Sequence, residues 1–534
     1  KKSYKKLQVV ICVLLVELCE RFTFFGIVCN MILFCTVKLG YDNFLAVTVN
    51  LCFIGASTLT PVLVGWFAET CLGRTKVLYL CAFLHFFTAM LPVVAFPFED
   101  FYIDTHHMTH KLDPIEQQIL FYVGLLAAAL GIGGIRAILC PMGAYSLQSC
   151  NQHQLLSFFN RFYWLVNLNS TVVFLGIAYI QQSVAQNLGF LIPFTSVLLA
   201  LIAIHMMRSK LTYKPKRGSL LTTLGVFLNS FKMCCLRHRH LSGDEVSWLD
   251  RAKENNGGRY SETHVENVKV LTKLFPLYGL QLLYRVCVTQ IPSGYYIQAM
   301  NSNLHLNGLL LPIGAMNVIS ILPLLLLAPL MEFVTTYFLS MEKTPLAPAR
   351  VILGHACAAV SVLVAGLVEL HRKAHPLVEQ TLSGKVLHVS SMPCFQLAPQ
   401  YILLGVAEAL VTPSSLISFQ LIPSHIRGIS LHFLTLSYGG GCLLGAFIIQ
   451  LVHFCSGNFY PNSLHDGNLE RFFFLLASLM TINTLLFWRL SYYMDLSVQG
   501  KPLSSSSLSD KLLQYKATLR FYDTVEHLST DSVL

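Results

Sequence analysis

Residues 7–37 read LQVVICVLLVELCERFTFFGIVCNMILFCTV, an apolar run that contains three charged side chains, Glu17, Glu20 and Arg21. A helix needs about 20 apolar residues to cross a bilayer, and this run is too long for the core of a signal peptide. A charge inside a bilayer costs several kcal/mol, so such residues usually face a cavity or a partner. The run therefore predicts a retained membrane helix whose charged face is turned into the protein.

The composition of the 534 residues agrees with a membrane protein. Hydrophobic residues make up 54% and charged residues 12% of the chain, whereas soluble domains carry about 25% charged residues. The formal net charge is +10, but the basic residues lie mostly between apolar runs, which favours membrane orientation over nucleic-acid binding. No nucleophile–base pair, clustered metal ligands or phosphate loop stands out, so we expect neither an enzyme nor a cofactor.

Apolar runs predict an all-α integral membrane protein of about twelve helices. Their approximate limits are 8–37, 44–69, 77–97, 119–141, 158–182, 189–207, 270–299, 309–338, 350–370, 396–421, 428–453 and 470–492. We therefore divide the chain into a six-helix bundle (1–207), a polar linker (208–269), a second six-helix bundle (270–492) and a polar tail (493–534). This plan is typical of secondary transporters built from two repeated halves, and here the repeat is inferred from hydropathy alone.

Basic residues predict the orientation. Lysines before the first span, Arg74 and Lys76 after the second, and many basic residues in 208–269 fall on one side of alternating helices. Both termini and the linker should therefore be cytoplasmic, in a plasma or endolysosomal membrane. The loop with Arg372, Lys373 and Lys385 contradicts this pattern. Within the linker, 220–235 predicts an amphipathic helix lying on the membrane surface or on the bundle.

The charges of the first span can form a proton-handling site. Glu17 and Glu20 share a helix face, and Arg21 follows Glu17 by four residues, within reach of a salt bridge. Two carboxylates beside one guanidinium can exchange partners, and a desolvated carboxylate has a raised pKa, which suits a proton carrier. The alternative is a static ion pair that holds helices together.

Two further arginines lie in or near apolar spans. Arg136 follows Gly131-Ile132-Gly133-Gly134, whose glycines permit close helix contact. This arginine can bridge to Glu17 or Glu20 or bind a substrate carboxylate bidentately; the alternative is an anchor to lipid phosphate. Arg285 lies in the middle of the seventh span, where it can be a substrate ligand or the partner of a distant carboxylate.

Weaker candidates complete the site. Tyr163 and Asn167 put a hydroxyl and an amide on one face of the fifth span, and Gln290, Tyr295 and Gln298 lie in the seventh. Glu69 and Arg74 flank a glycine-containing turn and form a gating or structural pair. Several isolated histidines, His85 and His355 among them, are expected to be satisfied core residues and receive no role.

Two of these motifs together resemble the proton-coupled oligopeptide transporters. Residues 17–26, ELCERFTFFG, are similar to the family's ExxERF signature followed by two aromatics and glycine, and residues 162–167, FYWLVN, are similar to its FYxxIN motif. The resemblance covers nearly the whole chain and is greatest to the peptide/histidine transporters of solute carrier family 15. It implies a monomer with a major facilitator superfamily fold that carries small peptides or related solutes by alternating access, with the proton as coupling ion.

The chain departs from the family at informative positions. The family usually has lysine where Arg136 stands, and two tyrosines where Phe24 and Phe25 stand. The glutamate that engages the peptide amino group falls at about Leu416. Because Arg285 also adds a positive charge, we expect a peptide-like or carboxylate-bearing substrate that is less cationic than a free peptide. The loss at Leu416 equally favours the alternative, a transport-impaired membrane scaffold or solute sensor that retains the fold.

Overall fold

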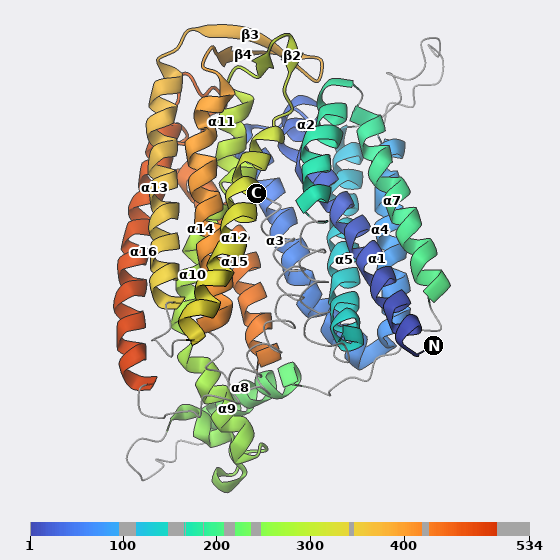
Figure 1. Cartoon of the computed structure of the whole chain (residues 1–534), viewed down its shortest axis with the longest axis vertical. Coiled ribbons are helices and arrows are strands. Elements are labelled where there is room, and N and C mark those ends of the chain that lie inside the picture. The colour runs from blue at the N-terminus through green and yellow to red at the C-terminus, as the bar shows by residue number, and fades with distance from the viewer. Residues whose placement is uncertain are drawn as a thin grey trace.

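The structure of the chain, a computed structural model, describes residues 2–95, 114–147, 165, 167–184, 186–207, 219–236, 247–340, 347–418 and 427–498. Long helices dominate these residues and lie in two side-by-side groups (Figure 1). The predicted all-α fold is confirmed. Six of the described helices are long and apolar enough to cross a membrane, and their outward surfaces carry exposed side chains such as Leu63 and Leu126.

The first group contains the N-terminal half of the chain. Its elements are α1 (Lys2–Val28), α2 (Met31–Val37), α3 (Asn43–Phe67), η1 (Ala68–Leu72), α4 (Arg74–Ala95), α5 (Pro114–Leu147), η2 (Val173–Ile177), η3 (Ile180–Val184) and α7 (Gln186–Met207). α1 packs on α5 and α7, and α4 packs on the same two helices. The charged face of α1 is thereby enclosed, as an intramembrane charge requires.

The second group contains the C-terminal half. Its elements are α10 (Phe275–Val288), η7 (Ile291–Tyr295), α11 (Tyr296–Met300), α12 (Ala315–Ser340), α13 (Ala347–Lys373), η8 (Cys394–Leu397), α14 (Ala398–Ser418), α15 (Arg427–Cys455) and α16 (Leu469–Val498). α14 packs on α12 and α13, while α10 packs on α15 and α16. Each predicted apolar span thus corresponds to a helical segment, although 158–182 is described only from residue 165 onward.

The linker folds into a small unit of its own at one end of the molecule (Figure 1). It consists of α8 (Ser219–Leu236), the short helices η5 (Trp248–Ala252) and η6 (Glu254–Asn256), and α9 (Glu262–Lys273). α8 covers the segment 220–235, where a helix was expected; Val226 is buried against Leu249 and Val265, whereas the apolar side chain of Leu228 is 69% exposed. Phe227 stacks on Phe275, with ring centroids 5.9 Å apart, and so fixes α8 to α10.

Two β-hairpins lie at the opposite end and were not predicted. They pair β1 (His305–Leu306) with β2 (Leu309–Leu310), and β3 (Leu377–Leu382) with β4 (Lys385–Ser390). Both turns place two residues at positive φ, Asn307-Gly308 and Ser383-Gly384. Positive φ at both central residues defines the two-residue turn that matches the twist of paired strands.

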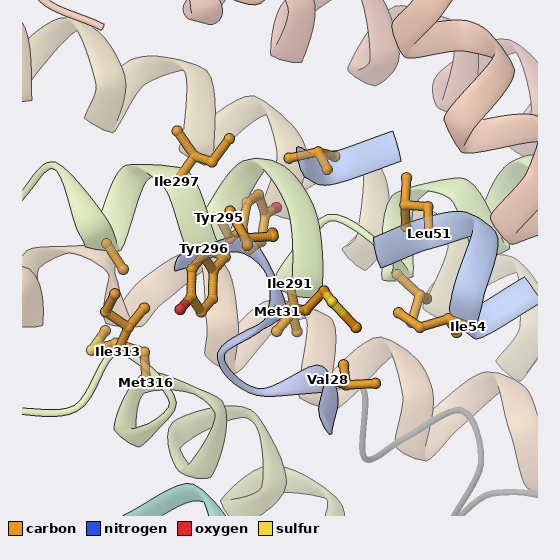
Figure 2. Packing of buried hydrophobic residues seen from close by; sticks show 14 of the residues in the cluster. Val28, Met31, Leu51, Ile54, Ile291, Tyr295, Tyr296, Ile297, Ile313 and Met316 are labelled. Atoms are coloured by element: carbon orange, nitrogen blue, oxygen red, sulfur yellow. The ribbon is translucent and has the colours of Figure 1, made fainter. Parts of the chain in front are cut away.

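The two helix groups meet near the hairpins. Val28, Met31 and Leu51 of the N-terminal half share one buried cluster with Ile291 and Tyr295 of the C-terminal half (Figure 2). Side-chain amides cross the same contact: they include Asn50 Nδ2, which donates to the carbonyl of Pro292 at 2.9 Å, and Gln182 Nε2, which donates to that of Leu311 at 3.0 Å. The backbone N–H of Ile313 donates in turn to Gln182 Oε1 at 3.0 Å. The hairpin end of the molecule is therefore closed.

Candidate functional site

The first cluster of buried charge is built on α1. Glu17, Glu20 and Arg21 are only 4%, 3% and 2% exposed. Arg21 Nε donates to Glu20 Oε2 at 2.7 Å, and Arg21 Nη2 donates to Glu20 Oε1. The sequence spacing predicted a pair between Arg21 and Glu17, and these two hydrogen bonds add the neighbouring Glu20 as a partner of Arg21. The guanidinium also lies over Phe24, with Cζ 4.7 Å from the ring centroid.

α5 brings Arg136 to the same cluster. Arg136 Nη2 lies 3.9 Å from Glu20 Oε1, which is an ion pair but too long for a hydrogen bond. The glycine-rich approach explains the placement: a Cβ on Gly133 would lie 2.5 Å from the Cβ of Thr60 on α3, so only glycine lets α5 pack this close. Because Arg136 is 7% exposed, it contacts Glu20 as predicted instead of projecting toward lipid phosphate.

The expectation of satisfied core histidines was wrong for His85 and His355. Both are fully buried, and neither ring nitrogen of either residue has a hydrogen-bond partner within the described part of the chain. His85, on α4, interacts electrostatically with Glu20 and Arg21. It therefore belongs to the surroundings of the first cluster, although one histidine in an apolar span gave no signal of this in the sequence.

The second cluster of buried charge joins α10 to α14. Arg285 Nη1 lies 3.3 Å from Glu408 Oε2 and 3.4 Å from Oε1. The hydroxyl of Tyr284 donates to Glu408 Oε1 at 2.5 Å, and Arg285 Cζ lies 3.5 Å above the ring of Tyr438 on α15. Of the two predicted possibilities for Arg285, the structure shows the distant carboxylate partner. Glu408 was missing from the predicted site, although an acid inside an apolar span is itself a signal.

The remaining candidates of the seventh span are packed inside the C-terminal half. Gln290, Tyr295 and Gln298 have no exposed surface. The hydroxyl of Tyr295 lies 2.9 Å from that of Ser361, and Gln290 Nε2 donates to the carbonyl of Val286 on its own helix at 3.0 Å. In the described part of the chain, none of these three side chains hydrogen-bonds a residue of the first or second charged cluster; Gln298 Nε2 donates instead to Glu369 Oε2 at 3.0 Å.

Other predicted residues are described in part or lie outside the described residues. Asn167 is 9% exposed, and its carbonyl accepts hydrogen bonds from the next helical turn. Tyr163 lies outside the described residues. The backbones of Glu69 and Leu416 belong to η1 and α14, but their side chains are not described. Arg74 begins α4, at the turn where the gating pair was expected.

A third buried pair accounts for the basic loop that contradicted the charge pattern. Arg372 Nε and Nη2 donate to Glu369 Oε2 and Oε1 at 2.9 and 2.7 Å, and Gln298 Nε2 adds a bond of 3.0 Å to Oε2. Lys373 Nζ lies 3.3 Å from Glu470 Oε1. Both cations are therefore neutralised inside the fold near the hairpin end. Of the three basic residues that gave the contradiction, only Lys385 lies on an exposed strand.

Comparison with known proteins gives a consistent picture. The family model described as PTR2, POT family, matches residues 88–461. The chain is 54% identical to solute carrier family 15 member 5 of Homo sapiens, over 99% of the chain and 92% of the relative, and 25% identical to member 3 of Mus musculus, over 89% of each. A crystal structure of an auto-inhibited POT family peptide transporter has the same fold, with a TM-score of 0.68, 16% identity and coverage of 93% of this chain and 98% of that one. The chain thus belongs to the POT family of multi-pass membrane transporters, within solute carrier family 15.

Proposed function

We propose that the chain is a proton-coupled symporter that carries small peptides or related carboxylate-bearing solutes by alternating access between its two halves. One observation carries this proposal: the buried carboxylate of Glu20 lies between two guanidiniums, those of Arg21 and Arg136. A proton on Glu20 neutralises the carboxylate that lies between these two arginines. A substrate carboxylate can then replace it, so proton and substrate enter together.

The geometry supports an exchange of partners. Arg136 approaches Glu20 to 3.9 Å without a hydrogen bond, and its Nε and Nη2 have no hydrogen-bond partner within the described residues. A buried guanidinium with unused donors favours a ligand with planar acceptor oxygens, such as a carboxylate. Glu17, on the same face of α1, is the second carboxylate to which Arg21 can turn when Glu20 is protonated.

The expected substrate charge changes in one respect. Arg285 was expected to add a net positive charge to the cavity, but Glu408 neutralises it. The preference for a less cationic substrate therefore rests only on Leu416, where the family's ammonium-binding glutamate is expected. We propose that the carboxylate end of a substrate is recognised and that a free amino end is not required.

The basic linker supports an orientation with both termini and residues 208–269 in the cytoplasm, of a plasma or endolysosomal membrane. The basic residues Arg372 and Lys373 contradicted this orientation in the sequence. Both are paired with buried acids, Glu369 and Glu470, so they count less as free positive charges of an outer loop. In this orientation the closed hairpin end faces outward. We propose that the monomer is the working unit, with each proton and substrate path inside one chain.

Uptake by the purified full chain in proteoliposomes tests the proposal. A labelled dipeptide and its N-acetylated form are offered with and without an imposed pH gradient, to the wild type, Glu20→Gln and the control Glu470→Gln. We expect gradient-driven accumulation of at least the N-acetylated form, lost in Glu20→Gln and retained in the control. Accumulation in Glu20→Gln equal to wild type would contradict the mechanism. Absence of flux for any probe, combined with stabilisation by one of them, would instead establish the sensor alternative.

A further inference from the structure

The linker helix α8 turns apolar side chains outward. Leu224, Leu228 and Phe231 are 46%, 69% and 66% exposed, and their spacing of four and three residues places them on one face of the helix. Thr223 and Ser230, on the other side of the helix, are buried. A helix face that borders water normally carries the polar residues instead. The outward face of α8 therefore requires an apolar environment.

Packing against the rest of the linker fixes this rotation of α8. Ser230 Oγ donates to the carbonyl of Leu249 at 3.3 Å. Gly225 lies directly against Tyr260, because a Cβ added to this glycine would be 2.0 Å from the tyrosine hydroxyl. Val226 is fully buried in the same small cluster. α8 therefore cannot turn its apolar face inward without losing these contacts.

The level of α8 along the molecule follows from the packing of α10 on α16. α10 begins at the linker end and α16 ends there, so the two helices run in opposite directions (Figure 1). Asn483 Nδ2 on α16 donates to the carbonyl of Leu280 on α10 at 3.0 Å. A helix rises about 1.5 Å per residue, so Phe275 and Trp488, each five residues closer to the linker end, both lie about 7.5 Å from this bond. Phe275 stacks on Phe227, so α8 lies at the level of Trp488.

Aromatic side chains mark this level as a membrane–water interface. Trp488, Tyr492 and Tyr493 at the end of α16 are 60%, 64% and 57% exposed. Trp248 of the linker, 46% exposed, contacts Phe227 with ring centroids 6.0 Å apart. Tryptophan and tyrosine gather at membrane surfaces because each ring has an apolar body and a polar group. In the proposed orientation of the chain, the exposed face of α8 thus lies where the cytoplasmic leaflet begins.

Two adjacent cysteines lie at the end of this face. Cys234 and Cys235 are both exposed, and Cys235 follows Phe231 by four residues on the same face. The cytoplasm keeps such thiols reduced. Cysteines on an amphipathic helix beside a membrane are sites of reversible acylation by fatty acids. α8 therefore presents two thiols where an attached acyl chain can enter the lipid directly.

We propose that Cys234 and Cys235 form an S-acylation site, and that their acyl chains enter the cytoplasmic leaflet beside Leu228 and Phe231. The acyl donor is a fatty acyl thioester of coenzyme A. The cysteine sulfur attacks the acyl carbonyl carbon, a new C–S bond forms, and the C–S bond of the donor breaks. The cysteine proton passes to the released coenzyme A thiolate, and nothing is oxidised or reduced. Two chains hold a segment at a membrane, whereas the binding of one is marginal.

Acylation at this site restrains the linker, because the spanning helices already hold the chain in the membrane. Phe227 of α8 stacks on Phe275 at the start of α10, and Phe275 contacts Phe433 on α15 with ring centroids 5.2 Å apart. Two acyl chains on α8 therefore restrain the linker ends of α10 and α15. The inference goes beyond the proposed transport and shares with it only the cytoplasmic position of the linker.

Counting the acylated cysteines of the full chain in cultured mammalian cells tests the proposal. Free thiols are blocked, thioesters are cleaved with hydroxylamine, and each released thiol is labelled with a maleimide–polyethylene glycol that adds one step of mass on a gel. We expect Cys234→Ser and Cys235→Ser each to remove one hydroxylamine-dependent step, and the double variant to remove two. The control Cys455→Ser, which replaces an exposed thiol at the far end of α15, should keep the wild-type pattern. Alkyne-tagged palmitate supplied to the cells should label the wild type and not the double variant.

A second pair of variants tests the lipid-facing side chains. Leu228→Glu places a charge on the apolar face and leaves both thiols in place, so both steps should be lost. Thr263→Glu places the same charge at an exposed position of α9 and should keep both steps.

Unchanged steps in the double cysteine variant, or steps without a palmitate label, would overturn the S-acylation site. Acylation of Leu228→Glu equal to that of the wild type would overturn the insertion of α8 into the leaflet. Both thiols are exposed and serine is close to cysteine in size, so the cysteine variants should fold normally. None of these readouts depends on flux, so their failure is separate from a failure of the transport proposal.

Discussion

The substitution Glu369→Gln should destabilise the fold more than any other single replacement of a buried acid in the C-terminal half. Glu369 has no exposed surface, and its carboxylate accepts three hydrogen bonds, two from Arg372 and one from Gln298. Glutamine removes the charge and can accept through one oxygen only. Among the described residues, Arg372, 1% exposed, then keeps a buried positive charge whose acceptors are uncharged: the carbonyl of Asn301 and the one amide oxygen of the new glutamine.

Breaking a buried pair by removing one partner typically costs about 3–5 kcal/mol. At about 1.4 kcal/mol for each factor of ten, the ratio of folded to unfolded protein should fall by roughly two to nearly four powers of ten. Equilibrium unfolding in mixed micelles of mild detergent and dodecyl sulfate measures this ratio. The double variant Glu369→Leu/Arg372→Met should recover most of the loss, because the charge is no longer orphaned. A double variant no more stable than the single one, or a single variant as stable as wild type, would refute the reasoning.

Two further predictions concern the closed end and the linker. In Gln182→Ala, the N–H of Ile313 loses its hydrogen-bond acceptor and the carbonyl of Leu311 loses its donor. Each buried group left without a partner costs about 1–3 kcal/mol of stability. The hairpin end should open more often, and labelling of the buried Cys29 by a membrane-impermeant maleimide should rise; unchanged labelling would contradict the role of this amide. In the linker, burial would raise the pKa of Asp250, but hydrogen bonds from Lys253 and Lys269 outweigh it and lower that pKa, and the same lysines lower the pKa of Glu266. A carboxylate whose pKa is lowered by folding stabilises the folded state at pH values above its pKa in the unfolded chain, about 3.9–4.3. That stabilisation is lost as the pH falls through the pKa of the folded state. Hydrogen exchange of residues 247–273 should therefore quicken below about pH 4, and less so in Lys269→Met.

The helices were predictable because the bilayer imposes one simple rule on the sequence. Every spanning segment must be apolar and must satisfy its own backbone, so hydropathy alone located each helical segment and the polar linker. Hydropathy did not predict the hairpins at Asn307-Gly308 and Ser383-Gly384, because their strands are short and lie outside the long apolar helices. The Asn-Gly pair is a recognised turn signal, and a search for turns would have found the first of them.

Part of the charged site was predictable: several members and the contact of Arg136 with Glu20 were expected, but Glu408 and His85 were not. Glu20, Arg136 and Arg285 stand out because each is a charge in or beside an apolar span. Which opposite charge each one meets depends on helix packing across the half: Arg285 and Glu408 are 123 residues apart in the chain. Within α1, the i,i+4 rule drew attention to Glu17, and the two short hydrogen bonds of Arg21 to its neighbour Glu20 were not expected.

The energetics of buried pairs indicate which charges can change during transport. Desolvation of two charges is recovered only by excellent geometry and additional hydrogen bonds. The pair of Glu369 and Arg372 has both, whereas Arg136 lies 3.9 Å from Glu20, too far for a hydrogen bond. A poorly compensated pair in a buried position is where functional charge is expected. The cation of this contact is arginine, which does not lose its proton in proteins. In the proposed mechanism the charge that changes is therefore that of a carboxylate, Glu20, while Arg136 and Arg21 stay positive and remain able to bind a substrate carboxylate.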